Sequence, residues 1–220
     1  ALGDLGRHVE ALASYEKVLA LQSDHLAPLN NQGALLIEVG RYADALCGID
    51  RALALSGNNV DALTNRGVAL RHLMRNEEAL ISYRKAAAIA PERPAILFNL
   101  GDVLGMLKRH DEAVNVFNKL LQVAPDYDFA KGRLLYEKML SCDWGGLGEL
   151  LETIEQDLHK DKSTVDPFGY ISASESELDL KRAAEIYGNK KFPRSSDVLP
   201  KIIGTRKSKI RVGYLCGEFR

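Results

Sequence analysis

Three asparagines, Asn31, Asn65 and Asn99, recur at one constant interval along the chain. A primary amide carries two N–H donors and one carbonyl acceptor, so one side chain can bind both the N–H and the C=O of a peptide backbone. Contacts of that kind hold the main chain and give affinity with little sequence selectivity. The alternative is that each amide bonds to a neighbouring helix and stabilises the fold. The threefold recurrence favours the first interpretation, a peptide-binding row.

No other set of residues predicts chemistry. The Gly145–Gly148 segment is rich in glycine, but it follows a predicted helix, whereas a phosphate-binding loop follows a strand. The basic run from Arg206 to Arg211 is interpreted as a solvated linker, with an anion or nucleotide site as the alternative. Trp144 is interpreted as a core residue. We therefore expect no catalytic residue, metal or cofactor, and we interpret the histidines, which lack metal-ligand spacing, as surface residues: His8, His25, His72, His110 and His159.

The residues around the asparagines share their period. Glycine, leucine and alanine hold fixed places in each unit: Gly33, Gly67 and Gly101; Leu29, Leu63 and Leu97; Leu36, Leu70 and Leu104; Ala11, Ala45, Ala79 and Ala113. A 34-residue period, with a small residue in a first helix and alanine followed by an aromatic four positions later in a second, resembles the tetratricopeptide repeat. We therefore predict an all-α fold, a right-handed superhelix of helix-turn-helix repeats, followed by capping helices and a short C-terminal strand.

The second repeat shows how such helices would place an asparagine. Leu29, Gly33 and Leu36 fall on one helical face, and a glycine, having no Cβ, lets the partner helix approach closely. Asn31 lies off this buried face, on the helix that lines the concave surface of such superhelices. Neighbouring helices pack about 8–10 Å apart and an extended peptide rises about 3.3 Å per residue. Successive asparagines would therefore meet a bound peptide at about every third residue.

The repeats are predicted to occupy residues 1–127. Pro91 and Pro125 close two of the second helices, because proline cannot continue the hydrogen-bond ladder. The first repeat is partial, with the tail of a first helix and a complete second helix in residues 1–25. A solenoid end needs a polar cap for solubility, so we expect further repeats before residue 1.

The period fails after the repeats, and three further parts are predicted. Residues 128–159 form capping helices, the second of which begins with Asp143 as its N-cap. Residues 160–209 form a linker that contains a short helix at 176–187. Residues 210–220 start with a β-rich run, which predicts the first or edge strand of another domain.

Composition excludes several classes of partner. The net charge of −1 argues against nucleic acid, which needs a dominant basic surface. No apolar run approaches the roughly 20 residues that span a bilayer, so no membrane association is expected. Cys47, Cys142 and Cys216 are scattered, and an odd, sparse count suits a reducing, cytoplasmic setting. These features favour another protein or an extended peptide as the partner.

The whole chain resembles one family. The asparagine-bearing repeats are followed by four shared segments: Cys142-Asp143-Trp144, Pro167-Phe168, a short helix with Ala183-Ala184 and Tyr187, and the run Lys209–Arg220. This combination looks like bacterial relatives of the O-linked N-acetylglucosamine transferase. The repeats alone are unspecific, and the Cys-Asp-Trp segment together with the terminal run makes the resemblance specific.

The resemblance implies that the chain binds protein substrates and that residues 1–220 lack the active site. Asn31, Asn65 and Asn99 would belong to a ladder that binds protein substrates, and residues 210–220 would begin a two-lobed, Rossmann-like glycosyltransferase region. The family's catalytic histidine and UDP-binding residues come later, so residues 1–220 are expected to be inactive on their own. The pair Cys216-Gly217 departs from the small polar residues usual at that place.

Two functions are therefore predicted, from different classes. The first is a superhelix that recruits proteins for a transferase moving a sugar from a UDP-sugar to serine or threonine. The second is a non-enzymatic scaffold for complex assembly or self-association as a homo-oligomer. A third, a clamp for the acidic C-termini of chaperones, is disfavoured because Asn30, Thr64 and Phe98 stand near the asparagines where such a clamp needs lysines.

Overall fold

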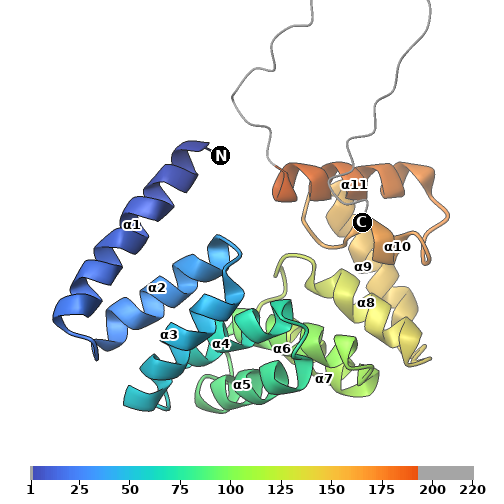
Figure 1. The fold of residues 1–220 in the computed structure, drawn as a ribbon. Coiled ribbons are helices and arrows are strands. Elements are labelled where there is room, and N and C mark those ends of the chain that lie inside the picture. The colour runs from blue at the N-terminus through green and yellow to red at the C-terminus, as the bar shows by residue number, and fades with distance from the viewer. Residues whose placement is uncertain (1, 193–220) are drawn as a thin grey trace, which may run out of the picture.

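A computed structural model describes residues 2–192, which fold into helices and connecting turns without a strand in that range (Figure 1). The strand expected within residues 210–220 lies outside the described residues. The helices are α1 (Leu2–Leu21), α2 (Leu26–Glu38), α3 (Tyr42–Leu55), α4 (Val60–His72), α5 (Asn76–Ile89), α6 (Pro94–Met106), α7 (His110–Val123), α8 (Ala130–Leu140), α9 (Leu147–His159), α10 (Pro167–Tyr170) and α11 (Glu177–Lys191).

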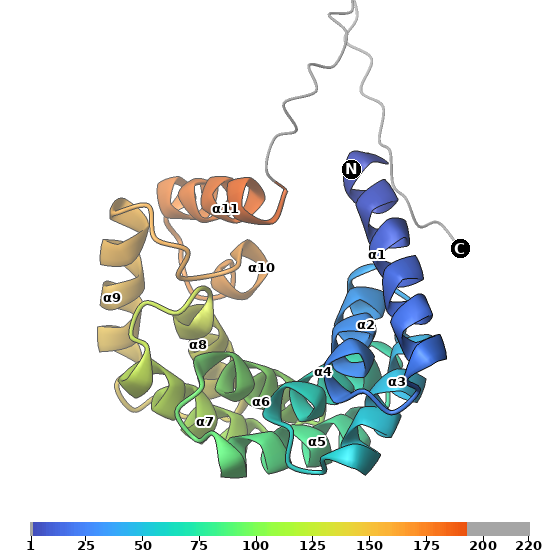
Figure 2. The ribbon, with the colours of Figure 1, turned by 90° about the vertical axis from the view of Figure 1, so that its left-hand side faces the viewer.

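The helices α2 to α7 form three helix-turn-helix pairs stacked side by side along an arc (Figure 2). Helices α2, α4, α6 and α8 line the inner side of the arc, and α3, α5 and α7 form its outer side. Each of these helices contacts its neighbours along the chain, and each inner helix also contacts the next inner one. This arrangement confirms the predicted all-α tetratricopeptide-repeat solenoid.

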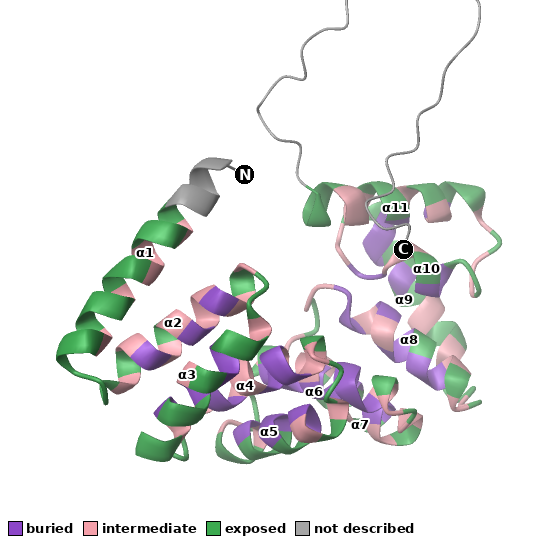
Figure 3. Ribbon diagram, viewed as in Figure 1, coloured by how far each residue is buried: buried purple, intermediate pink, exposed green. Residues whose placement is uncertain are grey.

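Buried residues gather where inner and outer helices meet (Figure 3). The predicted glycines are the points of closest approach. A Cβ added to Gly67 would lie 2.5–2.8 Å from three ring atoms of Tyr83, and one added to Gly101 would lie 2.7–2.9 Å from the ring of Phe117. Both rings are fully buried. Gly67 and Gly101 therefore make room for a ring from the paired helix, and Gly33 makes room for the side chain of Ile49 in the same way.

The phenol of Tyr83 titrates abnormally as a consequence of this packing. Burial raises its pKa to about 12, and the nearby Arg71 guanidinium, which lowers it, does not compensate. An unfolded tyrosine ionises at about pH 10, so the unfolded chain releases this proton first as the pH rises. We expect the free energy of unfolding to fall by about 2–3 kcal/mol from this residue between about pH 10 and 12.

Urea denaturation of the native protein and of Tyr83→Phe, each at pH 9 and pH 11.5, measures this effect. The Tyr83 hydroxyl is buried without a well-formed hydrogen bond, so its removal should leave the stability at pH 9 nearly unchanged. The variant should lose less stability on going to pH 11.5. Equal losses in the two proteins would contradict the assignment.

The C-terminal helices form a second core after the repeats. Its buried side chains come from α8, α9, α10, α11 and the segment before α10: Leu135, Ile154, Leu158, Val165, Tyr170 and Ala183. Helix α8 packs against α7 as the next inner helix, and α9 to α11 turn back toward the open side of the arc (Figure 2). The residues after the repeats are therefore packed helices over most of the range 128–191.

Three local expectations differ from the structure. Helix α9 begins at Leu147, because Gly146 adopts φ = 66°, and Asp143 accepts the N–H of Gly145 in the preceding turn instead of capping a helix. Trp144, expected in the core, is 63% exposed in that turn. At the N-terminus, α1 is one continuous helix from Leu2 to Leu21, where the tail of one helix and a second helix were expected.

Candidate functional site

The three predicted asparagines all lie on inner helices, Asn31 on α2, Asn65 on α4 and Asn99 on α6. Asn31 is exposed, whereas Asn65 and Asn99 are half-buried. Their common place in the repeat therefore brings all three to the helices of the concave side. Whether they bind a peptide stays a prediction.

The three asparagines differ in their side-chain hydrogen bonds. The Asn65 amide donates to Asn30 Oδ1 on the preceding inner helix, at 3.1 Å. This bond links α2 to α4, as the alternative interpretation expects of such an amide. It uses one donor, which leaves the second N–H and the carbonyl of Asn65 for a ligand. Asn31 and Asn99 make no side-chain hydrogen bond within the described part of the chain.

Asn99 lines a pocket of about 370 Å³. The pocket lies where the inner helices α4, α6 and α8 meet the C-terminal end of α11. Its walls carry charged, amide and aromatic side chains: Arg71, Phe98, Asn99, Asp102, Phe129, Arg133, Asp166, Tyr187 and Lys191. Neither Asn31 nor Asn65 is among them. The asparagine row therefore reaches a formed pocket at its C-terminal end.

A buried carboxylate organises the floor of this pocket. Asp102 is 7% exposed and pairs with Arg71 from the preceding inner helix, with 3.1 Å between Nη1 and Oδ2. Its other oxygen accepts from Arg133 of the following inner helix. A buried charge is stable only when paired and hydrogen-bonded. The triad of Arg71, Asp102 and Arg133 thus ties three successive inner helices together beside Asn99.

Arg133 continues the asparagine row. It follows Asn99 by the same interval that separates Asn65 from Asn99, at the place where the repeat would put a fourth amide. Arg133 is not among the predicted site residues, because the other repeat markers fail after Asp126. Extending the period by one step onto α8 would have found it. Asp102 and Arg71 carry no such signal, since their equivalents in the earlier repeat are Val68 and Ile37.

Aromatic rings form the other wall. Phe129 packs edge-on against Tyr187 of α11, with ring centroids 5.4 Å apart, and the Lys191 ammonium lies 5.2 Å from the centre of the Phe129 ring. Phe98 packs against Tyr127 at 5.3 Å. Such rings offer apolar surface and cation–π contacts next to the charged floor.

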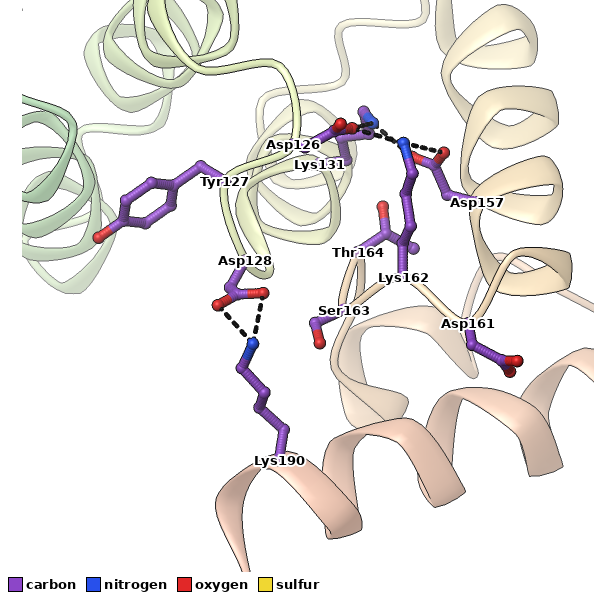
Figure 4. Close-up of a pocket in the computed structure, with 10 residues that line it drawn as sticks. All are labelled: Asp126, Tyr127, Asp128, Lys131, Asp157, Asp161, Lys162, Ser163, Thr164 and Lys190. Carbon is purple, nitrogen blue, oxygen red and sulfur yellow. Dashed lines mark hydrogen bonds and ion pairs between the residues drawn. The ribbon is translucent and has the colours of Figure 1, made fainter.

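A neighbouring network of ion pairs holds α11 beside the pocket (Figure 4). Lys190 of α11 reaches Asp128 at 2.9 Å, and Lys162 reaches Asp126 at 2.8 Å and Asp157 at 3.4 Å. The hydrogen bond from Lys162 lowers the pKa of Asp126.

Lys131 also pairs with Asp157, so each of the three lysines that line this second cavity has a carboxylate partner. The cavity, about 320 Å³ in volume, is a junction between the α7–α8 turn, α9 and α11. The junction fixes the helix that carries Tyr187 and Lys191.

Other candidates from the sequence lie elsewhere. His110 is not a surface residue as expected, because its ring lies 2.7 Å from the buried carboxylate of Glu137. No cluster of potential metal ligands exists in residues 2–192. Cys47 and Cys142 are exposed free thiols. Within the same range, no helix combines the length and the hydrophobicity that crossing a bilayer requires.

The comparisons with known proteins agree on the repeats. Residues 59–126, which contain α4 to α7, match the family model of the tetratricopeptide repeat. No curated protein matches the chain. Solved structures that resemble this chain do so at low sequence identity, so the similarity shows the fold alone.

A crystal structure of MamA superposes with a TM-score of 0.61 at 16% identity, covering 87% of this chain and 90% of that one. Residues 41 to the end of MamA from Desulfovibrio magneticus RS-1 superpose with a TM-score of 0.66 at 19% sequence identity, covering 71% of this chain and 89% of that one. YrrB, described as a TPR protein with an unusual peptide-binding site, superposes with a TM-score of 0.58 at 20% sequence identity, covering 80% of this chain and 94% of that one. The resemblance to the O-linked N-acetylglucosamine transferase stays a prediction.

Proposed function

We propose that this chain of tetratricopeptide repeats binds an extended protein segment along its concave side. The observation that carries the proposal is the pocket in which Asn99 and Arg133, successive members of one periodic row, face the same space. Amide and guanidinium groups at this spacing suit a peptide main chain that crosses one helix after another. A peptide-binding site in YrrB, which has a similar fold, is consistent with this use.

We further propose that the bound protein is a substrate of a glycosyltransferase. Its support is the resemblance of Cys142-Asp143-Trp144 and of the Lys209–Arg220 run to the O-linked N-acetylglucosamine transferase relatives. In this role the chain itself contributes recognition, and the transfer from UDP-sugar to serine or threonine takes place in sequence after Arg220. Hydrolysis of UDP-N-acetylglucosamine by a gene product that extends past Arg220 tests this part.

A scaffold that only assembles complexes is the second candidate. The bond between Asn65 and Asn30 favours it, because it gives one member of the row a structural role. A scaffold of this kind would bind through other surfaces and would tolerate loss of the row.

The triple variant Asn31→Ala, Asn65→Ala, Asn99→Ala separates these candidates. The probe is fluorescein-labelled (Ala-Ser-Gln)₄, whose peptide has no charged side chain and can reach the row only through main-chain, amide and hydroxyl contacts. Each lost hydrogen bond costs about 0.5–1.5 kcal/mol, so we expect binding at least about tenfold weaker by fluorescence anisotropy.

A matched control replaces two exposed asparagines of the outer helix α7, Asn115→Ala and Asn118→Ala. The control should bind the probe as the native protein does, and thermal unfolding should confirm that both variants are folded. If the triple variant binds the probe with native affinity, the row does not hold the peptide and the proposal is wrong.

A further inference from the structure

The pocket at the end of the row carries more positive than negative charge. Arg71, Arg133 and Lys191 line it together with two carboxylates, Asp102 and Asp166. The Asp166 side chain caps α10 by accepting the N–H of Gly169 at 2.9 Å, and it keeps its negative charge while doing so. Asp102 is satisfied by the two arginines. The net surplus is one cation, and it faces a space large enough for a side chain.

Both arginines keep most of their hydrogen-bond donors. A guanidinium has five N–H groups, and each arginine gives one nitrogen to Asp102. Arg71 Nε is buried near the Tyr83 hydroxyl and makes no well-formed hydrogen bond among the described residues. One arginine would be enough to neutralise Asp102. When Asp102 and Asp166 are counted against the three cations, one positive charge in the pocket remains without a counter-ion, which points to an anion that the protein does not itself supply.

The position of Arg133 in the periodic row after Asn31, Asn65 and Asn99 indicates which part of a bound segment would supply that anion. Three amides at successive steps suit a neutral main chain, and the fourth step replaces the amide by the guanidinium of Arg133. A segment that follows the row reaches Arg133 about three residues after Asn99. A guanidinium prefers a carboxylate to a neutral amide, because charge-assisted hydrogen bonds are roughly twice as strong.

We infer that this pocket binds the side-chain carboxylate of an acidic residue in the extended segment. The inference rests on the proposed function, and it adds a sequence preference to a row that otherwise reads only the main chain. The cations available to the carboxylate are Arg133 and Arg71 from the floor and Lys191 from α11. They outnumber by one the two carboxylates of the same pocket, Asp102 and Asp166. The rings of Phe98 and Phe129 cover part of the pocket wall. These cations are not the lysines near Asn31, Asn65 and Asn99 that a clamp for acidic C-termini would need, so the sequence around the asparagines does not reveal them.

Two peptides test this preference directly. Fluorescein-labelled (Ala-Ser-Glu)₄ places a carboxylate at every third position, so that a shift of at most two residues brings one to the pocket. The peptide (Ala-Ser-Gln)₄, with the same label, is its match without charged side chains. We expect the glutamate peptide to bind at least about tenfold more tightly at low salt, and the difference to shrink as salt rises. Equal affinities would overturn the inference while leaving peptide binding intact. Failure of both peptides to bind would instead contradict the proposed function.

The variant Arg133→Asn sharpens the test, because it extends the amide row by one step. It should remove the preference for the glutamate peptide and should keep the affinity for the glutamine peptide. Since this change also removes a partner of Asp102, Lys191→Gln serves as a second variant that leaves the Asp102 pairs untouched.

Lys191→Gln should lower the preference for glutamate two- to fivefold. Lys181→Gln is its control, since Lys181 lies on the same helix and does not line the pocket. Equal effects of the two lysine variants, or a full preference in Lys191→Gln, would overturn the inference even if Arg133→Asn failed to fold.

Discussion

Replacing both Gly67 and Gly101 by alanine should lower the free energy of unfolding by about 2–4 kcal/mol. Each new Cβ would lie within 2.9 Å of three ring atoms of Tyr83 or Phe117, and both rings are fully buried and cannot swing away. Overpacking of this kind costs about 1–3 kcal/mol at each site. Alanine recovers about 0.5–1 kcal/mol per site as the better helix former. Urea denaturation measures the net loss.

The control for this pair is Gly148→Ala with Gly188→Ala. Both glycines lie inside helices, α9 and α11, and a Cβ at either would meet nothing within 4 Å. The control should therefore gain about 0.5–1 kcal/mol per site. A loss of stability in the control, or none in the Gly67 and Gly101 variant, would contradict the close approach of the paired helices.

The second large effect is expected from Asp102→Asn. This change keeps the shape of the side chain and removes the charge that faces Arg71 and Arg133. Breaking a buried ion pair by removing one partner costs about 3–5 kcal/mol. Because the arginines are partly exposed and can regain water, we expect a smaller loss of about 2–3 kcal/mol. The loss should be smaller at high salt, which screens the repulsion between the two guanidinium groups.

Asp61→Asn is the matched control. Asp61 also pairs across successive repeats, with Arg93 at 2.6 Å, but both side chains are about half exposed. Exposed pairs of this kind contribute about 0–1 kcal/mol. If urea denaturation gives equal losses for the two variants, the burial of Asp102 is not what makes its pairs important.

The repeating part of the fold could be predicted because a recurring glycine marks where the two helices of each repeat pack closely. A glycine that recurs once per repeat has to meet a large side chain from the paired helix, and Gly67 with Tyr83 and Gly101 with Phe117 do so. The position of Asn31, Asn65 and Asn99 on the inner helices follows from the same register. These features depend on local spacing, which the sequence displays directly.

The pocket could be predicted only in part. Its triad joins Arg71, Asp102 and Arg133, which are 31 residues apart in each step, and this spacing departs from the period of the repeats. Its far wall comes from α11, whose place depends on tertiary contacts: the second hydrophobic core, which includes Ala183, and the ion pair between Lys190 and Asp128. Trp144 shows the same limit, because a leucine-rich neighbourhood suggested burial and a single glycine at φ = 66° moved the helix start past it.

The contacts between helices run only between neighbours in the stack, so no contact within residues 2–192 joins α1 to α11 across the open side of the arc. Small rotations at the interfaces between neighbouring helix pairs therefore add up over the whole stack. The distance between α1 and α11 should change at low energetic cost, as in an elastic superhelix. Under the proposed function, bound protein segments of different width would fit without a change in the packing of any single helix pair. Under tension, such an arrangement extends gradually before any helix pair gives way.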